Sequence, residues 1–91
     1  MITWGENKRK GNLKKHRIDF ADLVVLFNHY MYSEEDTSAN YGEVRIKSLC
    51  WFEGRVVRLI WLDQADSARL ISGRNATKHE TRIYFENAPL Y

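Results

Sequence analysis

The sequence predicts a small α+β domain in which a curved antiparallel sheet packs against helices, in the order β-α-α-β-β-β-α. Three observations predict this class. The middle of the chain holds three runs rich in β-branched residues, separated by turn signals. Apolar residues recur with helical spacing on either side of these runs. The composition, 44% hydrophobic and 13% aromatic, is that of an ordered globule, and 91 residues are expected to form one domain over 1–91.

The N-terminal part of the chain predicts a short edge strand followed by two helices. Residues 2–4 read as the strand, and residues 6–15 as a polar helix that Gly11 weakens. Residues 18–27 predict the second helix, with Asp19 as its N-cap. Its core-facing stripe is expected to consist of Phe20, Leu23, Val24 and Phe27. The acidic residues 28–42 that follow predict an exposed loop.

The rest of the chain predicts a three-stranded meander and a last helix. The strands are expected over residues 43–51, 55–62 and 67–73. A two-residue turn at Glu53-Gly54 and a loop over 63–66 separate them. The last helix begins near Thr77, because Thr77 and Glu80 have the spacing of a capping box, and it runs to about Glu86.

The register of this meander predicts a basic sheet face. A two-residue turn pairs Arg45 with Leu62 and Leu49 with Arg58, and a four-residue loop then sets Ile60 opposite Arg69. Since side chains alternate, one face is expected to be the core, formed by Val44, Ile46, Cys50, Val57, Leu59, Trp61, Ala68 and Leu70. The other face carries the cations Arg45, Lys47, Arg58 and Arg69. Because like charges this close repel each other, we expect an anionic ligand there.

Charge is unevenly distributed along the chain. Residues 1–17 carry six Lys and Arg against one Glu, residues 18–43 carry six acids and no Lys or Arg, and residues 44–91 carry eight Lys and Arg against five acids. This asymmetry favours a basic surface for a polyanion beside a separate acidic surface, with merely solvated surface charge as the alternative. Cys50 is the single cysteine, and neither a signal peptide nor an apolar span of membrane length is present. We therefore expect a cytoplasmic protein with no membrane partner.

Three segments together resemble a known family. Trp4, the run 12–16 (Asn-Leu-Lys-Lys-His) and Phe20 resemble the opening of the BrnT toxin family. Residues 42–45 (Gly-Glu-Val-Arg) resemble the start of its central hairpin, and residues 69–80 resemble its most recognisable segment, the last strand running into the last helix. The match covers residues 2–86 in order. Two departures concern the backbone, since Arg17 stands where the family usually has Gly and Gly73 where it usually has Ala.

The resemblance implies a RelE-like fold and RNA cleavage that blocks translation. It also implies neutralisation by a BrnA-like ribbon-helix-helix antitoxin, in a heterotetramer that binds operator DNA through the antitoxin. Two alternatives stay open, a non-catalytic nucleic-acid-binding module and a protein-interaction module that uses the acidic segment. Salt-dependent RNA binding without cleavage would indicate the nucleic-acid-binding module. Absence of tight RNA binding would indicate the protein-interaction module.

Cleavage of RNA without a metal needs cations at the scissile phosphate. Arg69 and Arg74 are the first candidates, because guanidinium groups offer forked, permanently charged donors to phosphate oxygens, and Arg45 is the next. The alternative is that each pairs with a protein carboxylate or carbonyl. Arg58 and Lys47 are expected to add affinity for RNA.

Acid–base chemistry is assigned first to His16, whose imidazole titrates near working pH, with Lys15 assisting it electrostatically. The alternative for His16 is a purely structural place at a helix C-terminus. Lys78 and His79 are expected to bind RNA. Glu80 is a candidate general base with a capping role as its alternative, and Glu43 is a candidate for the same role.

Two further chemistries are judged improbable. Three His and one Cys show no paired-ligand spacing, so no metal site and no cofactor are expected. Cys50 is expected to point into the core and not to act as a nucleophile.

Trp51 on the basic face is a candidate for stacking a base, with ordinary packing as the alternative. The expected activity is a metal-independent endoribonuclease that leaves 2′,3′-cyclic phosphates.

Overall fold

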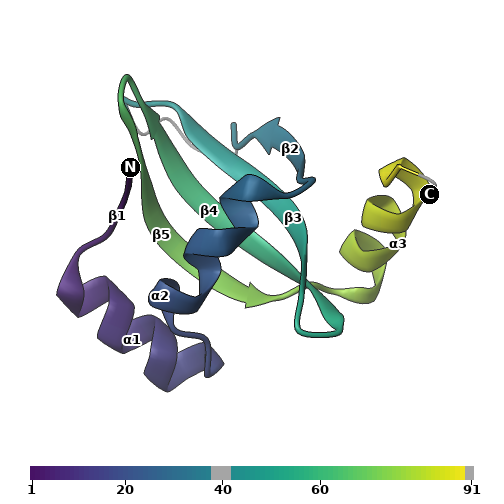
Figure 1. Ribbon diagram of the computed structural model, residues 1–91, viewed down its shortest axis with the longest axis horizontal. Helices are drawn as coiled ribbons and strands as arrows, with labels where there is room; N and C mark the ends of the chain where they lie inside the picture. The colour runs from purple at the N-terminus through teal and green to yellow at the C-terminus, as the bar shows by residue number, and fades with distance from the viewer. Residues whose placement is uncertain (38–41, 90–91) are drawn as a thin grey trace.

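The structure is a computed structural model that describes residues 1–37 and 42–89. Its strands form one sheet in the order β1-β5-β4-β3-β2, with helices on both sides (Figure 1). In chain order the elements are β1 (Ile2–Thr3), α1 (Glu6–His16), α2 (Phe20–Leu23), the 3₁₀ helix η1 (Val24–Asn28), β2 (Tyr32–Glu35), β3 (Arg45–Phe52), β4 (Arg55–Gln64), β5 (Ser67–Asn75) and α3 (Lys78–Asn87). The helices of this described part are too short or too polar to cross a lipid bilayer.

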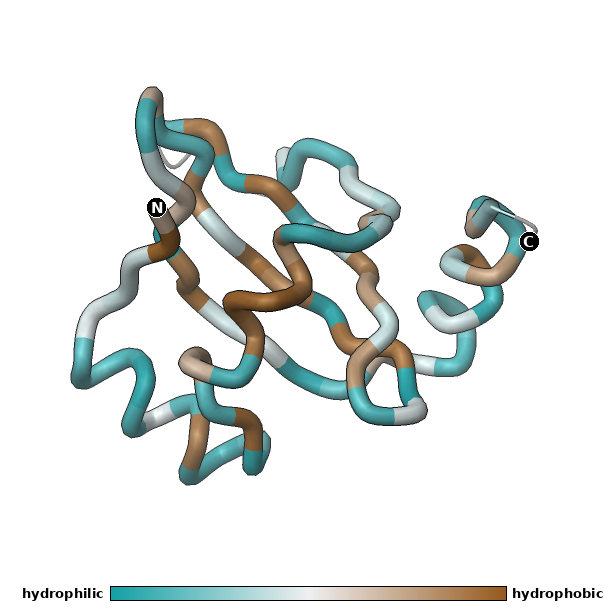
Figure 2. Tube along the Cα trace, in the orientation of Figure 1, coloured by the Kyte–Doolittle hydropathy of each residue, from teal (hydrophilic) through white to brown (hydrophobic). Residues whose placement is uncertain are grey.

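Each face of the sheet has its own apolar cluster. The short segment α2–η1 lies across one face, and its apolar stretch is the most hydrophobic helical part of the chain (Figure 2). The cluster beneath it contains Phe20, Leu23, Cys50, Val57, Leu59 and Leu70, as predicted for the core face. On the opposite face α3 covers one end of the sheet, where Tyr84 packs against Leu49 and Val56. The rest of that opposite face is the surface predicted to be basic.

The predicted α+β class is confirmed, and two strand predictions need correction. β1 joins the sheet parallel to β5, so the sheet is antiparallel except at this edge. The acidic region 28–42 is not a loop throughout, because Tyr32–Glu35 forms β2 against β3. Ser33 shares a hydrogen bond with Ser48, and charged side chains suit an edge strand that faces solvent. Residues 38–41 of the predicted loop lie outside the described residues.

The second predicted helix, over 18–27, is shorter and changes type. Asp19 caps α2 as predicted, since its carboxylate accepts a hydrogen bond of 3.1 Å from the Ala21 N–H. From Val24 the chain continues as the tighter 3₁₀ helix η1. Val24 and Val25 begin this stretch, and β-branched residues have low helix propensity because the preceding turn restricts them.

The predicted register is right for one strand pair and wrong for the other. All pairs between β3 and β4 match, including Arg45 with Leu62 and Leu49 with Arg58, because Glu53 and Gly54 form the two-residue turn with positive φ angles of 48° and 83°. Between β4 and β5 the turn is shorter than predicted, so Arg69 lies opposite Leu62 instead of Ile60. Val44 is 46% exposed and outside the core, because β3 begins only at Arg45.

Helix α1 is attached to β5 by one buried side chain. The Asn12 amide donates hydrogen bonds of 2.9 Å to the carbonyls of Ile18 and Gly73, and its oxygen accepts one of 3.0 Å from the Gly73 N–H. A Cβ at Gly73 would lie 2.8 Å from the Leu23 side chain, so this close contact favours Gly here. At the end of α1, Arg17 has a left-handed φ of 61°, a position that a glycine adopts without strain.

Candidate nucleic-acid interface

Five cationic side chains start from the sheet face opposite α2–η1. Their pairing places them in neighbouring positions on β3, β4 and β5: Arg45, Lys47, Arg58, Arg69 and Arg74. We call this set the basic face. Arg69 and Arg74 both belong to the basic face. They are five positions apart on β5, so a regular strand would place their side chains on opposite faces. Ile71 is the extra residue of a β-bulge, because Leu70 pairs with Trp61 whereas Ser72 pairs with Ile60.

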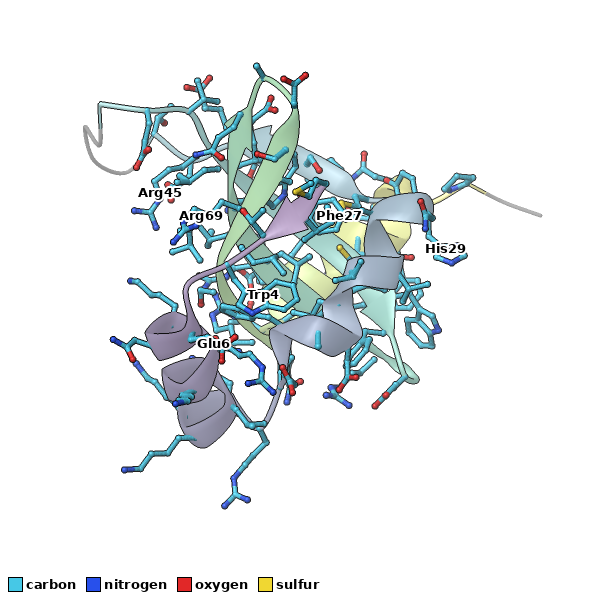
Figure 3. All side chains as sticks on the ribbon, turned by 60° about the vertical axis from the view of Figure 1, so that its left-hand side comes forward. Trp4, Glu6, Phe27, His29, Arg45 and Arg69 are labelled. Carbon is cyan, nitrogen blue, oxygen red and sulfur yellow. The ribbon has the colours of Figure 1, made fainter. Side chains whose placement is uncertain are left out.

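The arginines of the basic face form two pairs. Arg45 and Arg69 lie on either side of Leu62, and Figure 3 shows both side chains projecting outward on the same side of the molecule. Arg58 and Arg74 lie directly opposite each other on β4 and β5. The two pairs are four positions apart along β4, which is about 13 Å along a strand. The face therefore offers two centres of positive charge in a row.

Arg58 is half-buried between its neighbours on the basic face. Its Nη2 donates to the Ser72 hydroxyl at 3.3 Å, and its buried Nε has no hydrogen-bond partner among the described residues. Burial lowers the pKa of Arg58, and the charge of Arg74 lowers it further, although a guanidinium stays protonated at any working pH. A buried cationic donor without an acceptor destabilises the protein. An anion bound at this point would accept the missing hydrogen bond and offset that loss.

Arg74 is held in place by Glu80 of α3. Two hydrogen bonds of 2.9 Å and 3.2 Å join the guanidinium to the two carboxylate oxygens. Glu80 also accepts from the Thr77 N–H at 2.9 Å while its own N–H donates to the Thr77 hydroxyl, so the predicted capping box is present. Burial alone would raise the pKa of Glu80, but these hydrogen bonds outweigh it and hold the pKa below its usual range. This carboxylate is therefore a weak base in a structural position.

His16 ends α1 beside the Arg58–Arg74 pair. Burial holds the pKa of its imidazole below the ordinary value, because it disfavours the charged form. The positive charge of Lys15 lowers that pKa further, as do those of Arg58 and Arg74. His16 and Lys15 line a pocket of about 470 Å³ whose floor includes Ile71 and Ser72, so the bulge and the imidazole share one cavity. A neutral imidazole next to two guanidinium groups can accept a proton near a bound anion.

The other predicted residues are placed less centrally. Lys47 forms an ion pair of 3.3 Å with Glu34 of β2, which neutralises part of its charge. Lys78 and His79 are exposed in the first turn of α3, and Glu43 is exposed before β3. Trp51 contacts Phe85 with ring centroids 5.9 Å apart. These positions suit general affinity more than contact with a reacting phosphate.

Cys50 is buried, as predicted, and burial raises the pKa of its thiol to about 12. A thiol of this kind is a poor nucleophile. In residues 1–37 and 42–89, no three His, Cys, Asp or Glu side chains form a group that could hold a metal ion.

Sequence reasoning missed three features of this region. Ser72 and the bulged Ile71 were not identified, because a bulge depends on how neighbouring strands pair and leaves no local signal. The role of Asn12 in attaching α1 to β5 was also missed. A polar residue within the predicted helix 6–15 was only a weak signal for it. A second cavity of about 760 Å³ lies between η1 and α3, and apart from Trp51 no predicted site residue lines it.

Comparisons with known proteins identify a family and a similar solved structure. The family model described as the ribonuclease toxin BrnT of a type II toxin-antitoxin system matches residues 4–80. The crystal structure of the Brucella abortus ribonuclease toxin BrnT is similar, with a TM-score of 0.64 and 28% sequence identity. That similarity covers 85% of this chain and 96% of the Brucella chain. No individually curated protein matches the chain.

Proposed function

Because this chain belongs to the BrnT family of ribonuclease toxins of type II toxin-antitoxin systems, we propose that its basic face cleaves RNA without a metal ion. Arg58 and Arg74 bind the scissile phosphate, and the His16 imidazole acts as the general base. The observation that carries this proposal is that His16 shares a pocket with Ser72, whose hydroxyl accepts a hydrogen bond from Arg58. Arg58 in turn lies opposite Arg74 and has an unsatisfied buried donor.

The two arginines have the chemistry that the transition state requires. Attack of the 2′-oxygen on phosphorus adds negative charge to the phosphate oxygens, and preplaced cations stabilise that charge more than they stabilise the substrate. Glu80 fixes the orientation of Arg74 before RNA binds, so little ordering cost remains at the moment of reaction. Glu80 is in this scheme a positioning residue.

His16 removes the proton from the 2′-hydroxyl as the new 2′-oxygen–phosphorus bond forms. The bond from phosphorus to the 5′-oxygen breaks, and that oxygen takes a proton from water. The products are a 2′,3′-cyclic phosphate and a 5′-hydroxyl end. Lys15 contributes positive charge to the same pocket.

The second arginine pair extends the binding path for a single RNA strand. Arg45 and Arg69 lie in line with Arg58 and Arg74 along the sheet, so they bind a phosphate other than the scissile one. Lys47, Lys78 and His79 add affinity from the two sides of the basic face.

The protein partner of a type II toxin is its antitoxin. We propose an antitoxin of the BrnA-like ribbon-helix-helix type, which forms a heterotetramer with the toxin in the cytoplasm and carries it to operator DNA.

The test is cleavage of single-stranded RNA by the purified protein in EDTA, with sequencing of the new ends. Cleavage that survives chelation and leaves 2′,3′-cyclic phosphates is expected. His16→Gln and Arg74→Gln should each lower the rate by about 10²-fold or more. His29→Gln and Arg82→Gln are matched controls, since both residues are exposed and lie outside the basic face.

Three outcomes would contradict the proposal or part of it. Cleavage that stops in EDTA and returns with a divalent ion would replace the metal-free mechanism. Salt-dependent RNA binding with no cleavage would leave the basic face as a binding surface only. An unchanged rate in folded His16→Gln would remove the general base from His16.

A further inference from the structure

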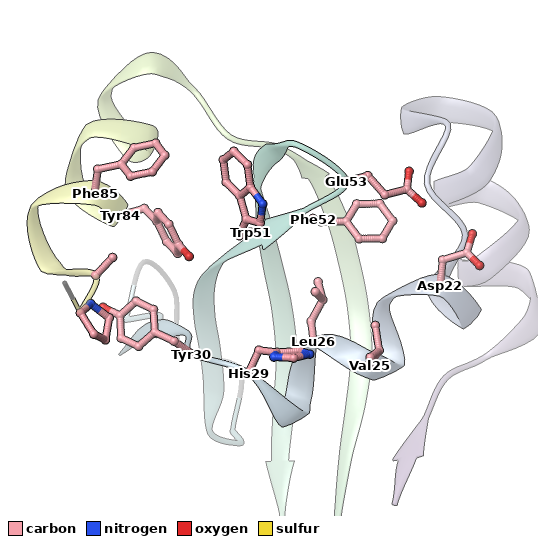
Figure 4. Close-up of a pocket in the computed structure, with 12 residues that line it drawn as sticks. Asp22, Val25, Leu26, His29, Tyr30, Trp51, Phe52, Glu53, Tyr84 and Phe85 are labelled. Carbon is pink, nitrogen blue, oxygen red and sulfur yellow. The ribbon is translucent and has the colours of Figure 1, made fainter. Parts of the chain in front are cut away.

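The proposed chemistry leaves unused the cavity between η1 and α3. Its volume is about 760 Å³, and Figure 4 shows it open between the Tyr84–Phe85 side of α3 and the η1 segment, with Trp51 and Phe52 of β3 between them. The cavity has a simple structural cause. β2 pairs with β3 only as far as Leu49, so beyond that point helices flank the end of β3 in place of a strand.

Exposed apolar side chains are concentrated in this groove. Val25 is 51% exposed, Trp51 48% and Phe85 55%, and together they are three of the six large apolar side chains exposed in the described residues. Trp51 and Phe85 contact each other edge to face, and Phe85 contacts Tyr84 with ring centroids 5.2 Å apart. A contiguous aromatic surface of this kind is typical of a site that binds another protein.

The charge of the groove restricts what can bind there. Asp22 and Glu53 belong to its lining, and no Lys or Arg does. The nearest arginine of the hairpin, Arg55, is held by Asn75 at 2.6 Å and stacks over the Phe52 ring. RNA is therefore disfavoured, because its phosphates would face carboxylates. A second copy of this chain is disfavoured too, since a two-fold contact would bring the same acidic patches together.

We propose that this groove binds a segment of the antitoxin that carries large apolar side chains flanked by lysine or arginine. The apolar side chains pack on Val25, Trp51 and Phe85, and the basic ones pair with Asp22 and Glu53. This inference rests on the toxin-antitoxin assignment of the proposed function, and it adds where the antitoxin docks. Antitoxin binding is thereby separate from the basic face that binds RNA.

The test measures affinity of the purified protein for the purified cognate antitoxin. Val25→Lys and Phe85→Lys should each weaken binding by at least about tenfold, because a cation replaces an apolar contact in a desolvated centre. Leu13→Lys is the matched control, since Leu13 is an exposed apolar residue on α1, outside the groove, and its substitution adds the same charge. Asp22→Asn should weaken binding less, and mainly at low salt.

Thermal unfolding and RNA cleavage are measured on the same variants, so that a folding defect is separated from a binding defect. Unchanged cleavage with lost antitoxin binding supports the docking site. Full antitoxin affinity in both groove variants, or loss of affinity in Arg58→Glu alone, would overturn it, as would failure of the unchanged protein to bind the antitoxin. RNA cleavage is measured in the absence of the antitoxin. A failure of the ribonuclease proposal would therefore appear as absent cleavage, independently of the affinity for the antitoxin.

Discussion

Arg69 and Arg74 lie on the same face of β5 although they are five positions apart, because the bulge at Ile71 reverses the alternation of side chains between them. Without the bulge one of the two would point toward the apolar cluster under α2–η1. The bulge therefore assembles a continuous basic face from a strand whose sequence does not have the matching two-residue period.

Replacing Arg69 by Ala should raise KM for RNA and leave kcat nearly unchanged, because Arg69 binds a phosphate other than the scissile one. The Arg69 side chain forms no hydrogen bond or ion pair with the described residues, and its backbone keeps its place in the sheet, so loss of the side chain should leave the free energy of unfolding nearly unchanged. Steady-state cleavage and denaturant unfolding measure both. A fall in kcat of about 10²-fold would contradict this role and mean that the charge of Arg69 acts on the transition state.

Glu80→Gln separates the two roles of Glu80. Glutamine still completes a capping box, so the unfolding free energy should fall by only about 1 kcal/mol. The charged contact with Arg74 is lost, and cleavage should slow by about tenfold because Arg74 is no longer fixed. Thr77→Ala, which removes the cap and keeps the Arg74 pair, is the control. Equal slowing in both variants would show that the start of α3, and not the orientation of Arg74, limits the rate.

The acidic limb of the pH–rate profile should lie below the pH at which an ordinary imidazole titrates. A lowered pKa keeps His16 neutral over a wider pH range, and the general base is active only when neutral, so kcat/KM rises with pH through that lowered pKa. Lys15→Gln removes one of the charges that disfavour the imidazolium form, and should move the limb to higher pH. NMR titration of the His16 ring checks the direction directly. A limb that does not move in Lys15→Gln would mean that another group titrates.

Asn12→Ala should reduce the free energy of unfolding by about 2–3 kcal/mol, because it leaves the Gly73 N–H and two buried carbonyls without their partner. The same change frees α1 from β5 and should reduce cleavage through loss of His16 positioning. Urea unfolding gives the first quantity, and Asn7→Ala, an exposed change on the same helix, is its control. A loss below about 0.5 kcal/mol would mean that water replaces the Asn12 amide.

Much of the fold follows from local signals. The Glu53-Gly54 turn fixed the β3–β4 register, because two residues with positive φ angles leave the strands only one pairing. Thr77 and Glu80 marked the start of α3 for an equally local reason, since a capping box needs only neighbouring residues. β2 could not be read in the same way, because a short acidic strand is stabilised by its partner β3 and not by its own composition.

By itself the sequence determined the α+β class, the hairpin register and the family resemblance, since each depends on residues close together along the chain or on their order. Only the tertiary structure decided which cations share a face, that Glu80 holds Arg74, and that His16 lies beside Arg58. The physical reason is that strand pairing and helix docking depend on the total packing of distant segments. A single bulge at Ile71, invisible in the local pattern, is enough to change which side chains meet.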